Sequence, residues 1–464
     1  MKHTTWIWFG VIWGLVHSSL ALANRPDKPL TSGDAVLTPD PRPLTPVVTV
    51  DEAVRMALDA SPILRSARRA VDAQEAIVSQ ARSGYYPRLA TQTRYTWQSE
   101  VDPFLITVPA AGPGLPRSIQ VSPVVTNTYG VRAQVQQAVF TAGRIGHRVE
   151  AARSQTDATR ARYDQTKSDF VFRVRQVYWE GVRAAELLRL AEDGLRRVEA
   201  HRKDLEHLRS VGMAVDRDLL QATVQEEETR LQAVRVEERR DLALIELRSL
   251  LGLPLDREVV LSDPPVPVEG PAGTVDEFVR QAIAQRPDLT GVRAQVEGAR
   301  STIRTARSEW FPQVSLLLNT DYARPNVRFV PLKDTWRRSW EAGVMFNWDV
   351  YDGGYRSARS AEAQARLDAA EAQAEETVRQ VTLDVHRAVR EVALSFQSWN
   401  VARTRVASAE ESARVTRAQF VQGLALSADV LDAENRLLAA RTDQASSGID
   451  WMMATAALDR AVGR

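Results

Sequence analysis

The sequence predicts an α+β membrane protein in which duplicated long helical hairpins adjoin four β-strands. Three observations support this fold class. The chain repeats itself, two long windows contain no proline and carry an apolar or small residue at every third or fourth position, and four segments alternate apolar with polar side chains. The expected order is a leader, an extended arm, and two copies of a unit made of a helix, two strands and a helical hairpin.

Residues 1–23 have the layout of a secretory signal peptide. Lys2 is followed by an apolar core and then by small residues at Ala21 and Ala23, so we expect cleavage near Asn24. The apolar core is too short for a stable membrane anchor. Cysteine is absent from the chain, which excludes disulfides, thiolate metal sites and a lipid-modified cysteine after the leader. The pattern therefore predicts an exported, unlipidated protein.

Composition narrows the classes of partner. The chain has 26% charged residues and a net charge of +1, so it has no global attraction to nucleic acid, and no nucleic-acid partner is expected. Residues 24–48 are rich in proline and predict an extended segment rather than a packed core. Beyond the leader there is no run of about 18 apolar residues, so contact with a membrane would have to use strands.

An internal duplication sets the domain organisation. The stretch TVDEAVRMAL, which begins at Thr49, returns as TVDEFVRQAI from Thr274, and the similarity continues into the strands and hairpins. We expect two structural repeats, 49–253 and 274–464, separated by a linker over 254–273. The first repeat has the longer loop between its two strands, and the prolines of that loop predict exposed, irregular chain.

Proline placement predicts the helical hairpins. All 22 prolines lie outside residues 143–253 and 332–464, and a long helix does not tolerate proline in its interior. The spacing of apolar and small residues in these windows is that of a coiled-coil seam. A helix over residues 143–210 would be about 100 Å long at about 1.5 Å per residue. Such a rod must pack along other rods, because no compact domain accommodates it.

Each proline-free window has one internal break, at Gly212 and at Gly423. Glycine suits the left-handed C-terminal cap of a helix, and Asp216 or Ser427 can cap the helix that follows, so each break predicts a tight hairpin tip. Four apolar side chains lie beside the tip glycines: Met213, Val215, Leu424 and Leu426. They either contact a helix of another protein or pack within the tip itself.

Four strands are expected, over Arg88–Trp97, 124–140, 313–322 and 336–350. Their length and terminal aromatics are typical of transmembrane barrel strands, although a half-buried soluble sheet alternates in the same way. Four strands leave unpaired edges in lipid, so a membrane barrel would have to close between subunits, as a dimer, trimer or tetramer. Five aromatic residues are candidates for the membrane interface: Tyr95, Trp97, Trp336, Trp340 and Trp348.

Glycines mark the predicted passage from strand to helix. FTAGR holds Gly143 in the first repeat, and YDGG holds Gly353 and Gly354 in the second. Glycine reaches backbone conformations that other residues avoid, so these positions let the chain turn from the sheet into the rod.

Several motifs in this order resemble the TolC family of outer membrane efflux factors. They are the duplicated TVDEAVRMAL opening, FTAGR and YDGGYRSARSAEAQ after the second strand of each half, and ADVLDAE beyond the second tip. The resemblance covers nearly all of the chain after the arm. It implies a homotrimer whose strands form an outer-membrane β-barrel that continues into a periplasmic tube of helices.

The resemblance also implies a function and partners. Members of the family are passive exit ducts of tripartite efflux pumps or type I secretion systems. The implied partners are a periplasmic adaptor, an inner-membrane pump of RND, ABC or MFS type, and outer-membrane lipid, and no cofactor is implied. The alternative is a soluble periplasmic coiled-coil adaptor or structural protein, for which a two-fold duplication with tryptophan-rich strand pairs has no evident purpose.

Acidic side chains follow both predicted tips: Asp216, Asp218, Asp429 and Asp432. Three-fold symmetry would gather them at the narrow end of the tube, and the resemblance implies that Asp429 and Asp432 line the periplasmic entrance. Acids in a first helical turn also complement the helix dipole, which explains Asp429 equally well. The family's lock uses a tyrosine and an arginine where this chain has Phe420 and Ala425, so that lock cannot form here.

The sequence offers no candidate catalytic residue and no metal site. The histidines of the mature chain are scattered, and His201 and His207 are not one helical turn apart, as a helical metal pair requires. Neither a nucleophile with its base nor a phosphate-binding loop occurs. We therefore expect a protein that is not an enzyme.

Overall fold

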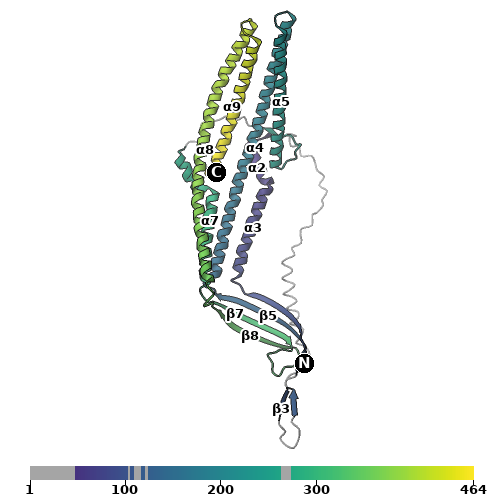
Figure 1. Cartoon of the computed structure of the whole chain (residues 1–464), viewed down its shortest axis with the longest axis vertical. Coiled ribbons are helices and arrows are strands. Elements are labelled where there is room, and N and C mark those ends of the chain that lie inside the picture. The colour runs from purple at the N-terminus through teal and green to yellow at the C-terminus, as the bar shows by residue number, and fades with distance from the viewer. Residues whose placement is uncertain (1–46, 103–104, 109–116, 121–123, 263–272) are drawn as a thin grey trace. The chain divides into compact units, whose positions relative to one another are not determined.

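The computed structural model describes residues 47–102, 105–108, 117–120, 124–262 and 273–464 (Figure 1). The predicted leader and most of the predicted arm lie outside these residues. The chain from Val47 to Arg464 forms one unit. It combines long helices with one four-stranded sheet and two short two-stranded sheets. No described helix is both long enough and apolar enough to cross a membrane.

The two repeats contain the same main elements in the same order. The first comprises α2 (Val50–Ala60), α3 (Pro62–Ser83), β2 (Arg88–Trp97), β5 (Asn127–Phe140), α4 (Arg144–Ser210) and α5 (Asp216–Leu251). The second comprises α6 (Val275–Gln285), α7 (Pro287–Ser308), β7 (Gln313–Arg324), β8 (Arg337–Asn347), α8 (Tyr355–Val421) and α9 (Ser427–Val462). Helices α4 and α8 have 67 residues each, and α5 and α9 have 36 each. This equality confirms the duplicated long hairpins.

The short helices begin with matching local signals. The Thr49 hydroxyl accepts a hydrogen bond from the Glu52 amide at 3.3 Å, and Thr274 forms a reciprocal capping box with Glu277 at the start of α6. Helices α3 and α7 both start at a proline, whose missing N–H costs nothing at that position. Each repeat therefore enters its helix pair in the same way.

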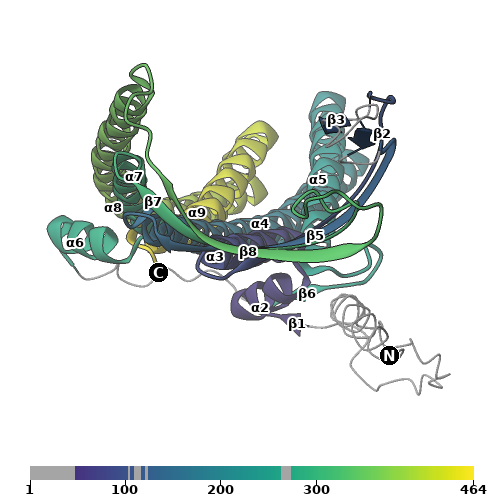
Figure 2. The same cartoon turned by 90° about the horizontal axis from the view of Figure 1, so that it is seen from below.

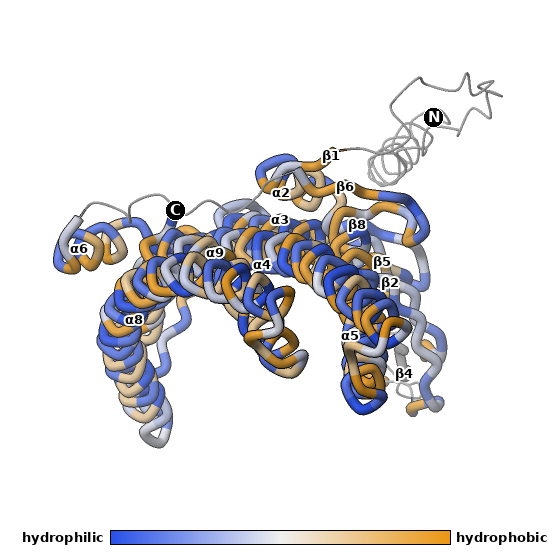
Figure 3. The backbone as a smooth tube through the Cα atoms, turned by 90° about the horizontal axis from the view of Figure 1, so that it is seen from above, coloured by the Kyte–Doolittle hydropathy of each residue, from blue (hydrophilic) through white to orange (hydrophobic). Residues whose placement is uncertain are grey.

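The core lies where the short helices cover the long ones. In the first repeat Val174 and Tyr178 of α4 are fully buried against α2 and α5, and the Tyr178 hydroxyl donates to the Val48 carbonyl at 3.0 Å. In the second repeat Val381 and Val385 of α8 are buried with α6 and α9. Away from these clusters, polar and apolar residues are interspersed along the helices (Figure 3). The long hairpins consequently keep polar faces over much of their length.

The four-stranded sheet is antiparallel throughout, with strand order β2-β5-β7-β8, and it is curved (Figure 2). Pairing of β5 with β7 joins the two repeats, and a register shift lies between Ala138 and Phe140. All four predicted strands are present. The first has the predicted bounds, whereas β5 starts later than predicted, β7 runs on to Arg324, and β8 is shorter at both ends.

Two short sheets were not predicted. The loop between β2 and β5 contains the antiparallel pair β3 (Leu105–Val108) and β4 (Arg117–Gln120), so the prediction of wholly irregular chain there is wrong. Its prolines flank these short segments rather than interrupt them. The parallel pair β1 (Val47–Val48) and β6 (Val260–Leu261) joins the end of the predicted arm to the predicted linker.

Candidate functional site

The four-stranded sheet has one apolar face. Cross-strand partners lie on the same side of a sheet, so the register assigns each side chain to a face. One face gathers large apolar side chains that are all exposed: Leu89, Tyr95, Val131, Leu316, Leu318, Tyr322, Trp340, Val344 and Phe346. An apolar surface of this extent marks a contact with lipid or with another protein.

The other face is polar and partly covered. Arg132 Nε lies 2.6 Å from Asp321 Oδ1, across β5 and β7. The Asn319 amide donates to Glu341 Oε1 at 2.7 Å, and Arg328 forms an ion pair with the same carboxylate. Arg328 belongs to the β7–β8 connection, which folds over this face.

Asn326 holds this connection in place. Its side chain is 4% exposed and donates to the Arg337 carbonyl at 3.1 Å and to Ser339 Oγ at 2.9 Å. The sheet therefore has a polar side that is folded over by its own chain and an apolar side whose large residues remain exposed.

Aromatic residues gather at both ends of the strands. At the ends far from the long helices, the ring of Tyr129 lies 5.1 Å from that of Tyr95, and Trp336 stacks on Tyr322 at 4.9 Å. At the opposite end, Trp348 Nε1 donates to the Trp310 carbonyl at 3.2 Å. This arrangement matches the two aromatic girdles of membrane barrels.

Of the five aromatic residues predicted at the membrane interface, Tyr95, Trp97 and Trp336 lie at the far ends of the strands and Trp348 near the helices. Trp340 lies within β8, between the two groups, and is 69% exposed. Their roles at an interface stay a prediction.

The strand-to-helix junctions use left-handed backbone in both repeats. Gly353 and Gly354 have φ of 67° and 90°, and Gly143 has φ of 81°. Ala142 occupies the position that matches Gly353, with φ of 49°, which is unfavourable for a residue with a Cβ. The sequence indicated one residue with left-handed backbone at the first junction, Gly143. The structure has two, Ala142 and Gly143.

The helical tips have the predicted glycines but not the predicted N-caps. Gly212 and Gly423 are left-handed, with φ of 79° and 75°. The N-cap positions are Val215 and Leu426, and Asp216 and Ser427 are the first helical residues, so the capping prediction is wrong by one position. At the second tip Asp429 Oδ2 instead accepts the Leu426 amide at 2.9 Å, which stabilises the helix start.

Each of the four tip carboxylates already has a partner. Asp216 lies 2.5 Å from Arg209, across the tip from α5 to α4, and Asp218 lies 3.8 Å from Arg217. Asp432 pairs with Arg436 at 2.6 Å, one turn further along α9. Asp429 acts as a helix cap, which agrees with the dipole interpretation of this residue. The net negative charge at the tips is therefore smaller than the four aspartates alone suggest.

The apolar residues at the tips are exposed. Met213 is 76% exposed, Leu424 74%, Leu426 68% and Val215 58%. Packing within a tip therefore does not bury them, and they are free to contact another chain. Ala425, between the two leucines, is half-buried.

An antiparallel contact between α4 and α9 joins the two hairpins, and we call it the α4–α9 seam. From the core towards the tips, its pairs are Arg175 with Asp459 at 3.3 Å, Arg183 with Asp450 at 2.5 Å, Gly194 with Leu438, Arg197 with Glu434 at 2.9 Å, and His201 with Ser427 at 2.9 Å. A Cβ on Gly194 would lie 3.1 Å from the Leu438 side chain, so this glycine permits the close approach. Sequence reasoning missed the seam because its pairs lie far apart in the chain.

The tip end of the seam is buried and polar. Glu434 is 7% exposed and contacts Arg197 of α4 and Arg417 of α8, the latter at 2.6 Å. The Arg197 contact is close but is not aligned as a hydrogen bond, so it is purely an ion pair. One carboxylate thus holds arginines from both hairpins.

His201 and Phe420 complete this end of the seam. His201 is 5% exposed, and its ring lies 5.3 Å from the ring of Phe420 at an angle of 63°. Burial lowers the pKa of His201, against the attraction of Asp204, so the imidazole is held in its neutral form. Phe420 thus makes an aromatic contact between the two hairpins.

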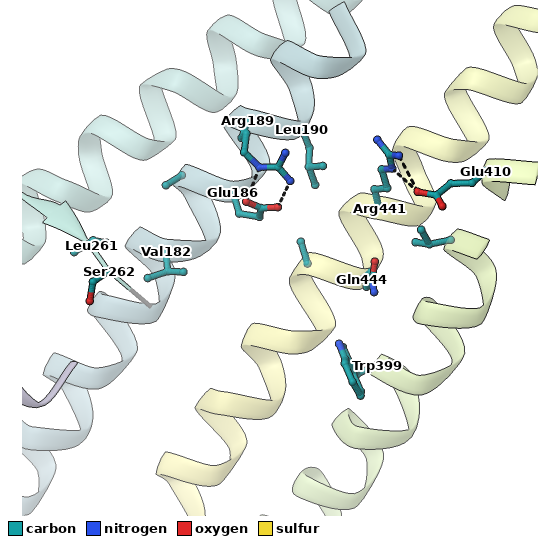
Figure 4. Close-up of a pocket in the computed structure, with 13 residues that line it drawn as sticks. Val182, Glu186, Arg189, Leu190, Leu261, Ser262, Trp399, Glu410, Arg441 and Gln444 are labelled. Atoms are coloured by element: carbon teal, nitrogen blue, oxygen red, sulfur yellow. Dashed lines mark hydrogen bonds and ion pairs between the residues drawn. The ribbon is translucent and has the colours of Figure 1, made fainter. Parts of the chain in front are cut away.

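A groove interrupts the seam between Arg183 and Gly194 (Figure 4). It has a volume of about 830 Å³ and is lined by residues of α4, α8 and α9 together with Leu261 and Ser262, with Trp399 on the α8 side. An ion pair stands on each side, Arg189 with Glu186 at 2.6 Å and Arg441 with Glu410 at 2.7 Å. The hairpins therefore touch above and below the groove. Among the described residues, no cluster of three or more potential ligands could hold a metal ion.

Comparison with known proteins identifies the family to which the chain belongs. The family model described as outer membrane efflux protein matches residues 53–253 and 278–464, which is most of the chain and falls on both repeats. The chain belongs to the outer membrane efflux protein family. It is an outer-membrane channel.

Individual relatives and a solved structure agree. The channel is 23% identical to the outer membrane protein TolC of Vibrio cholerae over 318 residues, which is 68% of this chain and 72% of that protein. It is 22% identical to the alkaline protease secretion protein AprF of Pseudomonas aeruginosa, over 64% of this chain and 62% of AprF. The crystal structure of CusC superposes with a TM-score of 0.75 at 21% identity and covers 89% of this chain and 92% of CusC.

Proposed function

We propose that three copies of the chain form a passive exit duct that spans the outer membrane and the periplasm. This proposal rests on the difference between the apolar and the polar face of the four-stranded sheet. In a single chain β2 and β8 are the edges of the sheet, and edges exposed to lipid leave backbone groups unsatisfied. Closure with two further copies pairs these edges, turns the apolar face to lipid and encloses the polar face around water. The chain itself is not an enzyme, and energy comes from its partners.

We propose that the tips form the periplasmic entrance and the docking surface for an adaptor. Three-fold repetition would bring Asp218 and Asp432 close together, with Asp429 contributing mainly as a helix cap. The exposed Met213, Val215, Leu424 and Leu426, beside Gly212 and Gly423, suit the apolar face of an adaptor hairpin. The adaptor links the duct to an inner-membrane pump of RND, ABC or MFS type.

The α4–α9 seam is proposed to keep the entrance closed. Phe420 and Ala425 cannot form the hydrogen bonds and ion pairs of a tyrosine and an arginine. Glu434, with its arginines from α4 and α8, and the His201–Ser427 contact instead hold the second hairpin against the first. Opening would separate α9 from α4.

Protein secretion and efflux of small molecules are both compatible with such a duct, and the name of AprF points to protease secretion by that relative. A deletion strain, scored in parallel for intracellular dye accumulation and for proteins lost from the medium, tests the proposal. We expect a defect in at least one assay that a plasmid copy restores. Normal export in both assays, with the protein verified in the parent strain, would contradict a role as an exit duct.

A further inference from the structure

The polar face of the sheet has a hollow lined by arginines, which we call the arginine hollow. It has a volume of about 280 Å³ and lies over Gly130 of β5, where a missing side chain leaves space. Three guanidinium groups line it, from Arg94 of β2, Arg132 of β5 and Arg328 of the β7–β8 connection. Asp321 is the only carboxylate among its described lining residues.

The charges of the arginine hollow do not cancel. Asp321 is engaged by Arg132 at 2.6 Å, and Arg328 pairs with Glu341 beside the hollow. Arg94 is exposed and has no ion-pair partner among the described residues. Its cross-strand neighbours on this face are Gly130 of β5 and, one pair further along, Arg132. One positive charge therefore remains free at a site that already holds two paired arginines.

We propose that Arg94, together with the arginine hollow, is an oxyanion-binding site in the lumen of the barrel, for the carboxylate or phosphate groups of acidic cargo. This inference rests on the proposed trimer, in which the polar face lines the pore and three copies of Arg94 form a ring. Rings of arginine are the device by which pores attract anions. Arginine binds both oxygens of a carboxylate or phosphate, and Gln92 supplies a neighbouring amide.

Arg94 and Arg88 lie at different depths on the polar face. Arg94 lies in the half of β2 that is farther from the long helices, whereas Arg88 starts the strand at the helical end. Arg88 lies on the same polar face and is also exposed without an ion-pair partner among the described residues, but it stands outside the arginine hollow. The tips, where each carboxylate is already paired, present no comparable free charge.

Arginine labelling of the purified trimer in detergent tests the site without the need for an open channel. Phenylglyoxal would be applied with and without inorganic phosphate, or with a tetraglutamate peptide, and labelled residues would be read by peptide mass. We expect both anions to slow the labelling of Arg94 several-fold and to leave Arg88 unaffected. Equal protection of Arg94 and Arg88, or protection of neither, would overturn the proposal.

A second measurement uses planar bilayers. Phosphate added on the barrel side should lower the current of the wild-type channel, and R94Q should abolish this block, whereas the matched variant R88Q should retain it. Block that persists in R94Q contradicts the site. Failure of the wild-type protein to form channels would contradict the proposed duct instead, and the labelling result would still decide the binding site.

Discussion

Replacing Val344 with arginine should prevent stable assembly of the channel in the outer membrane. Val344 is 69% exposed on the apolar face of β8, opposite Leu316 and between the two aromatic groups. An arginine on the lipid side near the middle of a barrel strand costs about 2–4 kcal/mol, and the trimer would bear this cost three times. The measurement is the amount of protein in purified outer membranes, with the temperature at which its trimer dissociates on a gel.

The neighbouring variant Gly343→Arg is the matched control. Gly343 lies on the polar face of the same strand at the same depth, and a Cβ added there meets no atom within 4 Å. It should therefore assemble like the wild type. If both variants assemble equally well, or if Gly343→Arg alone fails, the assignment of the two faces is wrong.

The variant Glu434→Gln should open the entrance. The buried carboxylate holds Arg197 and Arg417, and neutralising it leaves the partly buried Arg197 and the exposed Arg417 facing an amide. The cost lies between the about 1 kcal/mol of an exposed pair and the about 3 kcal/mol of a fully buried one, which would raise the open population by about one to two orders of magnitude. We expect higher single-channel conductance in planar bilayers, together with entry of a large hydrophilic dye into cells.

Two control variants distinguish an effect on the α4–α9 seam from a general effect of removing a negative charge. Glu411→Gln removes an exposed pair with Arg414 within α8 and should leave conductance unchanged. Asp432→Asn, at the proposed entrance, should lower cation preference without opening the channel. If Glu434→Gln only lowers thermal stability while the conductance stays at the wild-type level, the α4–α9 seam does not control the entrance.

Sequence patterns predicted the elements because each depends on local spacing. Absence of proline, alternation and the tip glycines indicated α4, α8, the four strands and Gly212 and Gly423, all of which the structure contains. The β3–β4 pair was missed because nearby prolines outweighed two very short segments.

Contacts between distant segments were beyond such reasoning. Glu434 and Arg197 meet only after the 36-residue α9 is laid along the 67-residue α4, and nothing in their local sequence marks them. Likewise Arg94 looks like any polar strand residue until the register places it beside Gly130 and Arg132. For the tip carboxylates the error runs the other way. The local sequence marked them as a candidate site, but spacing alone could not show the arginines that pair with Asp216 and Asp432.

The most direct test of a trimeric outer-membrane channel is gel mobility of the protein from fractionated cells, with and without heating. We predict that the protein is found in the outer-membrane fraction, and that unheated samples contain a species of about three chains that heating converts to the monomer. Recovery from the soluble periplasmic fraction, as a monomer before and after heating, would contradict this assembly.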